Sequence, residues 1–141
     1  MSDALYQQAL KDLAQAAHGA GRLAIPDAEA LRDNPLCGDR VRIEVTTTDG
    51  VITALAQETK GCLLCRASAS LLGLRAPGRK PEDIAAAAQA LRKLLQDGGE
   101  WRADAPESWP ELVVFLPVRA HPSRHGCVLL PIETLLQALS R

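Results

Sequence analysis

Two runs rich in β-branched residues, joined by Asp49-Gly50, constrain the fold of this 141-residue chain more than any other feature. The runs are Val41–Thr48 and Val51–Thr53 with the residues that follow it. An Asp-Gly pair between two such runs is a strong signal for the two-residue turn of an antiparallel hairpin. The sequence therefore predicts a hairpin here, and Leu23–Ile25 is a candidate third strand before it.

Helical periodicity frames the hairpin on both sides. Apolar residues recur at intervals of three and four from Asp3 to His18, which is typical of an amphipathic helix. Together these patterns predict a small antiparallel sheet of about three strands covered by helices, which is an α+β fold. We expect it to form a single domain over residues 1–141. Four later segments are also predicted to be helical: Leu63–Leu74, Pro81–Gln96, the short stretch Glu111–Val118, and Cys127–Leu139.

Composition narrows the classes of partner. Lys plus Arg total 16 and Asp plus Glu total 17, so the net charge of -1 favours neither nucleic acid nor a membrane surface as a partner. The longest apolar runs, such as Leu112–Val118, are far shorter than the roughly 20 residues of a membrane-spanning helix. No leader pattern is visible at the amino terminus, so we expect a cytoplasmic protein whose partners are proteins or small species.

The four cysteines are the main candidates for chemistry. In a cytoplasmic chain of this size, metal binding or thiol chemistry is favoured over disulfides. Cys37 and Asp39 lie in a turn-rich stretch just before the hairpin, whereas Cys62 and Cys127 each follow a glycine at a predicted helix start. A helix start favours a reactive thiolate. Three thiolates and one carboxylate suit tetrahedral zinc or an iron–sulfur cluster.

Spacing alone leaves a second interpretation open. Cys62-x-x-Cys65 is the only pair with metal-like spacing, and no second pair completes a zinc ribbon. The cysteines could instead be small core residues, and this is the favoured interpretation for Cys65. His125 is expected to point away from the site, and the tryptophans Trp101 and Trp109 are expected to anchor the polar loop Gly99–Pro110 in the core.

Three motifs carry a family resemblance. The motifs are Asn34-Pro35-x-Cys37-Gly38-Asp39, Gly61-Cys62-x-x-x-x-Ala67-Ser68-Ala69-Ser70, and Val118-Arg119-x-x-Pro122-x-Arg124-x-x-Cys127-x-x-Leu130-Pro131. They resemble the IscU/SufU/NifU amino-terminal-domain family of iron–sulfur cluster assembly proteins, in the right order, from about Tyr6 to Leu139. The resemblance implies a SufE/IscU-like α+β fold with helices on a three-stranded sheet.

One position separates two branches of this family. The scaffold branch carries a histidine directly before its third cysteine, whereas here Gly126 precedes Cys127. The 64 residues between Cys62 and Cys127 are also similar to the SufU branch, which has an insertion in that interval. The chain is therefore identified by resemblance as SufU-like.

The resemblance implies roles for individual residues. In SufU-like proteins the set Cys, Asp, Cys, Cys binds zinc, and the first cysteine receives persulfide sulfur from a cysteine desulfurase. Carried over, Cys37 is the sulfur acceptor and a zinc ligand, and Asp39, Cys62 and Cys127 are the other ligands. Arg124 is expected close to the site, where it offsets negative charge. We expect the four ligands to meet at one solvent-reachable site at the edge of the domain.

Three functions follow as alternatives. The first is a zinc-dependent sulfur acceptor of a cysteine desulfurase, which would make the chain a zinc-dependent sulfurtransferase. The second is a scaffold on which an iron–sulfur cluster is assembled and passed to acceptor proteins. The third is a binding module whose zinc is structural. Arg22, Arg40, Arg119 and Arg124 could form an arginine patch for an acidic partner, and ordinary solvated charges are an equally favoured interpretation for Arg22 and Arg40.

Overall fold

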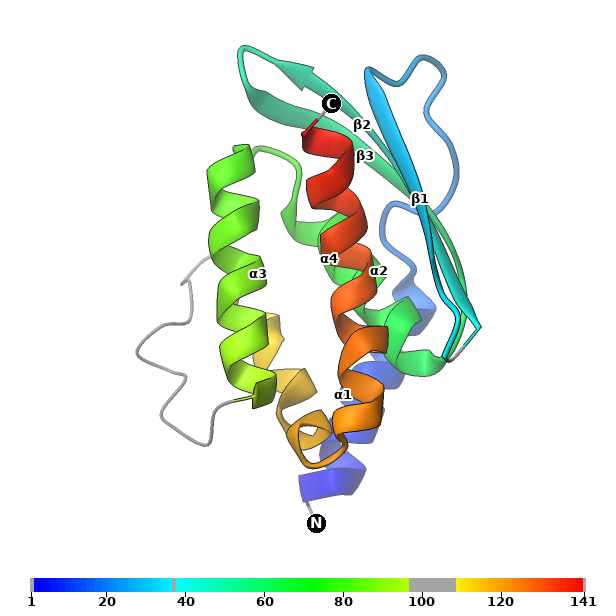
Figure 1. Ribbon diagram of the computed structural model, residues 1–141, viewed down its shortest axis with the longest axis vertical. Helices are drawn as coiled ribbons and strands as arrows, with labels where there is room; N and C mark the ends of the chain where they lie inside the picture. Colours follow the sequence, from blue (N-terminus) through cyan, green and yellow to red (C-terminus); the bar gives the residue numbers. More distant parts are fainter. Residues whose placement is uncertain (1, 37, 97–108, 141) are drawn as a thin grey trace.

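The computed structural model describes residues 2–36, 38–96 and 109–140, with side chains described from residue 8 onward. Within those residues three strands form one sheet, and helices pack on one of its faces (Figure 1). The fold class and the predicted helices are confirmed, except that the segment before the last helix is a 3-10 helix. The elements are α1 (Ser2–Ala16), β1 (Ala28–Asn34), β2 (Asp39–Thr48), β3 (Val51–Lys60), α2 (Leu63–Arg75), α3 (Pro81–Gln96), η2 (Pro110–Ala120), η3 (Pro122–Arg124) and α4 (His125–Leu139).

The hairpin forms as predicted. β2 and β3 pair antiparallel, with Thr48 opposite Val51 across the turn. Both turn residues have positive φ, 53° for Asp49 and 79° for Gly50. That conformation matches the twist of the flanking strands and is tolerated by Asp and Gly.

The predicted third strand is wrong in position. Leu23–Ile25 is irregular, and the third strand is β1, which pairs antiparallel with β2 in the order β1-β2-β3. The amide of Leu23 donates to the Glu44 side chain at 2.8 Å, and Ile25 is 82% exposed. β1 buries little apolar surface, with Ala30 as its one fully buried residue among those described. Because β1 is held mainly by backbone pairing, its sequence lacks the apolar alternation that predicts a strand.

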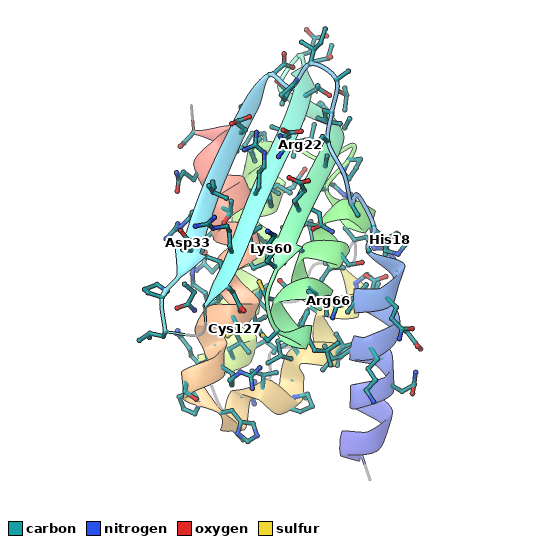
Figure 2. The ribbon with its side chains drawn as sticks, turned by 90° about the vertical axis from the view of Figure 1, so that its right-hand side faces the viewer. His18, Arg22, Asp33, Lys60, Arg66 and Cys127 are labelled. Carbon is teal, nitrogen blue, oxygen red and sulfur yellow. The ribbon has the colours of Figure 1, made fainter. Side chains whose placement is uncertain are left out.

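The sheet has two unlike faces. Val41, Ile43 and Val45 alternate along β2 on the face that the helices cover, and each is fully buried. α4 packs against β1 and β2, α2 packs against β3 and α4, and α3 packs against α4 and η2. Arg40 and Arg42 point to the opposite face, because successive strand residues alternate in direction. In Figure 2 that face is turned toward the viewer.

The prediction that Trp109 lies in the core is confirmed. Trp109 and Phe115 are both fully buried and belong to the apolar core. Trp101, the Tyr6 side chain and the polar loop up to residue 108 lie outside the described residues. None of the described helices has the length and apolar character needed to span a membrane.

Candidate metal centre

Three of the four predicted ligands meet at one place. Asp39 is the first residue of β2, Cys62 directly precedes α2, and Cys127 lies in the first turn of α4. One ligand atom from each of these residues lies within 4.8 Å of the others. Figure 2 places Cys127 just beyond the ends of the strands. Cys37, the fourth predicted ligand, lies outside the described residues.

A short network joins the strand and the helix at this centre. The backbone N–H of Cys62 donates to Asp39 Oδ1 at 2.9 Å, and the Cys62 thiol donates to Asp39 Oδ2 at 3.4 Å. The carboxylate thus accepts from a backbone amide at the helix start, where unpaired amides need partners. Both Asp39 oxygens face Cys62, which directs the carboxylate toward the sulfur atoms.

Burial at the centre is uneven. Asp39 is 1% exposed and Cys127 is 0% exposed, whereas Cys62 is partly exposed. The expectation of a solvent-reachable site therefore holds in the described residues only at Cys62. A carboxylate and a thiol held this deeply need compensating charge or hydrogen bonds, because burial disfavours ionised groups.

Gly61 makes the approach of Asp39 sterically possible. A Cβ placed on Gly61 would lie 2.6 Å from Asp39 Cγ and 3.0 Å from Asp39 Cβ, which is too close for non-bonded atoms. Glycine is the residue used where another group must approach the backbone this closely. Gly61 is part of the second motif, and this contact gives the physical reason for its presence.

Arg124 supplies positive charge to the two sulfurs. Hydrogen bonding to Cys62 and then to Cys127 raises the pKa of its guanidinium above the usual value, against a smaller opposing effect of burial. A cation beside a thiol stabilises the thiolate form. The expected position of Arg124 near the site is confirmed, and η3 is the element that carries it.

The donor set fits a thiophilic metal. Two ligand atoms that are each about 2.3 Å from one tetrahedral zinc ion lie roughly 3.8 Å apart. This separation is compatible with the three ligand atoms here, which all lie within 4.8 Å of one another. Two thiols and one carboxylate match the donors of sulfur-rich zinc sites and of iron–sulfur sites. Cys37 is two residues from Asp39 along the chain, in the same motif.

Two other candidate ligands point elsewhere. His125 Nε2 lies 3.1 Å from the carbonyl oxygen of Val118 and 3.2 Å from that of Arg119, so this nitrogen faces η2. Cys65 is fully buried within the apolar core, as expected. Neither residue belongs to the cluster of ligand atoms formed by the described residues.

The serines of the second motif have a structural role that sequence reasoning did not assign. Ser68 Oγ donates to the carbonyl oxygen of Val128 at 2.7 Å, in a buried bond between α2 and α4. Ser70 Oγ accepts from the backbone N–H of His18 at 3.0 Å. Val128 directly follows Cys127, so the Ser68 bond fixes the helix segment that carries this thiol.

Asn34 connects the first motif to the third. Its carbonyl oxygen accepts from the Gly38 amide at 2.8 Å, and its Oδ1 accepts from the Leu36 amide at 3.1 Å. A Cβ on Gly126 would lie 2.9 Å from Asn34 Nδ2. The residue before Cys127, which separates the two branches of the resemblance, is therefore packed against the loop that carries the first motif.

Comparison with known proteins establishes the family. The chain matches the NifU-like N terminal domain over residues 5–105, which is more than half of its length. The chain belongs to this family. The predicted membership of the IscU/SufU/NifU amino-terminal-domain family is thereby confirmed.

Named relatives extend over almost the whole NifU-like chain. The iron-sulfur cluster assembly scaffold protein IscU of Thermotoga maritima is 27% identical over 143 residues, covering 97% of this chain and 94% of its own. The protein of the same name from Streptococcus pyogenes is 28% identical, with 97% and 84% covered. Both relatives therefore share nearly all of the domain described above.

Solved structures agree in fold. The N-terminal domain of a nitrogen-fixing NifU-like protein from Brucella abortus has a TM-score of 0.89 at 31% identity, covering 98% of this chain and 94% of that one. An iron-sulfur cluster assembly scaffold protein for the SUF system from Fervidobacterium islandicum has a TM-score of 0.84 with 99% of each chain covered. At 22% identity this second likeness concerns the fold alone.

Proposed function

We propose that this chain is a cytoplasmic iron–sulfur cluster assembly protein of the SufU-like type, which accepts sulfur from a cysteine desulfurase at a zinc site. The observation that carries the proposal is the convergence of Asp39, Cys62 and Cys127, with Arg124 on the sulfurs. The proposed ligands are these three residues and Cys37. Membership of the NifU-like family, with relatives named as assembly scaffolds, supports the same process.

The four donors suit a resident zinc ion. Bound zinc would hold the thiols as thiolates without oxidising or reducing the sulfur they carry. Three thiolates and a carboxylate around a dication leave two net negative charges, and the Arg124 guanidinium compensates one of them. Asp39 adds a carboxylate that is already oriented by the Cys62 amide.

Cys37 is the proposed acceptor of sulfur. Its thiolate would attack the outer sulfur of a persulfide on the desulfurase cysteine, forming a new S–S bond as the old one breaks. The electron pair of the broken bond leaves with the desulfurase thiolate, so no external oxidant or reductant is needed. Along the chain Cys37 lies between Pro35 and Gly38, whereas Cys62 and Cys127 are held at helix starts.

A scaffold is the second candidate function. The relatives from Thermotoga maritima and Streptococcus pyogenes are named as scaffolds, and a site with several thiolates also suits an iron–sulfur cluster as cargo. In that case the completed cluster would pass to acceptor proteins. A purely structural zinc is less well supported, because the described residues form an extensive apolar core that can stabilise the fold without a metal.

Metal and sulfur analysis separates these functions. Protein purified without oxygen should contain one zinc and show no visible absorption, whereas iron with inorganic sulfide would favour the scaffold. After incubation with a cysteine desulfurase and cysteine, mass spectrometry should find the persulfide chiefly on Cys37. Persulfide on Cys62, Cys65 or Cys127 instead, or sulfide release unchanged in Cys37→Ala, would contradict the assignment. Loss of folding on chelation would indicate a structural zinc.

Asp39→Ala tests the ligand set directly. Removal of the carboxylate should lower zinc affinity by at least about 10- to 100-fold, since that is the loss seen when only an outer partner of a metal ligand is removed. Cys65→Ser is the matched control and should retain zinc, because this thiol lies in the apolar core. Equal zinc content in Asp39→Ala and wild type would remove Asp39 from the ligand set.

A further inference from the structure

The face of the sheet opposite the helices, called the open face below, carries a groove with a basic lining. Its volume is about 640 Å³, and it runs between the ends of β2 and β3, the segment after α1, and the first turns of α2. Glu58 is its only acidic lining residue among the residues described. The basic lining residues are Arg22, Arg40, Arg42, Lys60 and Arg66.

The chain segment after α1 forms one wall of this groove. The Gly19 carbonyl accepts from the Gln57 amide at 2.8 Å, and the Gly21 amide donates to the Gln57 carbonyl at 3.0 Å. This pairing holds Arg22 beside Glu58, with 3.0 Å between Nη2 and Oε1. The wall is therefore fixed by backbone hydrogen bonds.

Two like charges face each other at the end of the groove. Arg40 on β2 is directly opposite Lys60 on β3, and both project from the open face. Like charges in this arrangement destabilise a sheet. Asp33 compensates Arg40 at 2.6 Å, but neither Lys60 nor Arg66 has an ion pair with any residue that the structure describes. Figure 2 shows Lys60 and Arg66 near one another on this face.

The uncompensated charges lie next to the candidate metal centre. Lys60 is the last residue of β3, and only Gly61 separates it from Cys62. Arg66 lies on α2, whose start is at Cys62. A partner held by these two side chains would sit beside the partly exposed thiol.

We propose that this basic groove is a docking surface for an acidic segment of a partner protein. Leu31, which is 49% exposed, also lines the groove and provides an apolar contact among arginines, a composition typical of protein interfaces. The chain as a whole has a net charge of -1, which disfavours nucleic acid or an anionic membrane as the ligand. The proposal goes beyond the proposed sulfur transfer and does not depend on which metal is bound.

Peptide binding to charge-reversal variants tests the surface. The probe is a fluorescein-labelled peptide of twelve residues, rich in Glu and Asp with a central Leu, followed by fluorescence anisotropy at low salt. Lys60→Glu should weaken binding about fivefold or more, and added salt should weaken wild-type binding as the charges are screened. The variant should fold, because it replaces a like-charge pair with an opposite-charge pair beside Arg40.

Lys80→Glu is the matched control. Lys80 is an exposed lysine that follows α2, outside the groove, and its reversal changes the net charge by the same amount. We expect this variant to bind the peptide within about twofold of wild type. Arg66→Glu should behave like Lys60→Glu, and peptide-induced NMR shifts should centre on Leu31, Lys60 and Arg66.

Several results would overturn the proposal. Equal weakening by Lys60→Glu and Lys80→Glu would mean that only net charge matters. No detectable peptide binding at low salt, or binding that Lys60→Glu leaves unchanged, would exclude the groove. Displacement of the peptide by a short RNA or by vesicles of anionic phospholipid, at lower concentrations than unlabelled peptide, would show that the class of ligand is wrong.

Discussion

The candidate metal centre and the basic groove adjoin at Gly61, but short-range contacts determine the first and long-range charge interactions the second. At the centre, Asp39 and Cys127 are buried and their positions are set by contacts shorter than 4.8 Å. Along the groove, Lys60 and Arg66 are exposed and act through charge over longer distances. Adding or removing a single atom should therefore disturb the centre strongly, and salt should have little effect on it. Interactions at the groove should depend on salt and tolerate small changes in side-chain shape.

Adding one methyl group at Gly61 is the strongest test of the centre. Gly61→Ala should lower the free energy of unfolding by roughly 1–3 kcal/mol, because the Asp39 side chain must be displaced by a new Cβ. Metal retention should fall in the same variant. Denaturant unfolding and zinc analysis provide the two measurements.

Gly126→Ala is the matched control for that prediction. The nearest atom to a Cβ at Gly126 is Asn34 Nδ2, the end of a side chain that can rotate, and alanine is the better residue within α4. Its stability should stay within about 1 kcal/mol of wild type. A larger loss at Gly126 than at Gly61 would contradict the close approach of Asp39 as the reason for Gly61.

Acid should weaken the sheet through Glu44, on the open face outside the groove. The hydrogen bond from the Leu23 amide holds the pKa of Glu44 below its usual value, although burial opposes this, and Arg42 acts in the same direction as Leu23. The stabilisation is therefore complete above the unfolded pKa of about 4.3 and is lost as pH falls through the lower folded value.

Glu44→Gln should reveal this contribution. We expect the variant to be less stable than wild type by about 1 kcal/mol at pH 7, with the difference shrinking below about pH 4. Glu29→Gln, which also removes a carboxylate from Arg42 but at an exposed position, should show a smaller difference. A difference at Glu44 that stays constant from pH 7 to pH 3 would refute the assignment.

The groove should show its charge repulsion as a small cost in stability. Lys60→Gln should raise the free energy of unfolding by a few tenths of a kcal/mol at low salt, since it removes a like charge opposite Arg40. The gain should shrink in high salt, and Lys11→Gln, at an exposed position within α1, should show no such gain. An unchanged or lower stability of Lys60→Gln would contradict a net repulsion between Arg40 and Lys60.

Local patterns were sufficient for much of the fold. The hairpin at Asp49-Gly50 and the helices α1, α2 and α3 were predictable because their determinants are turn residues and apolar spacing within a few residues. β1 was missed because Ala30 is its one buried residue among those described, so backbone pairing with β2 holds it without an apolar pattern. The 3-10 form of η2 was not predicted either. Pro117 lies inside this helix, and packing against α3, which no local pattern shows, helps to set its form.

The sequence by itself determined which residue types could form a site, because Cys62 and Cys127 follow glycines at predictable helix starts and the motifs resemble a known family. The tertiary structure alone decided that Asp39, Cys62 and Cys127 meet, since they belong to a strand and two helices far apart along the chain. It also placed His125 toward η2 and gathered Lys60 and Arg66 in one groove. Such distances depend on how the whole chain packs, which no local pattern of residues encodes.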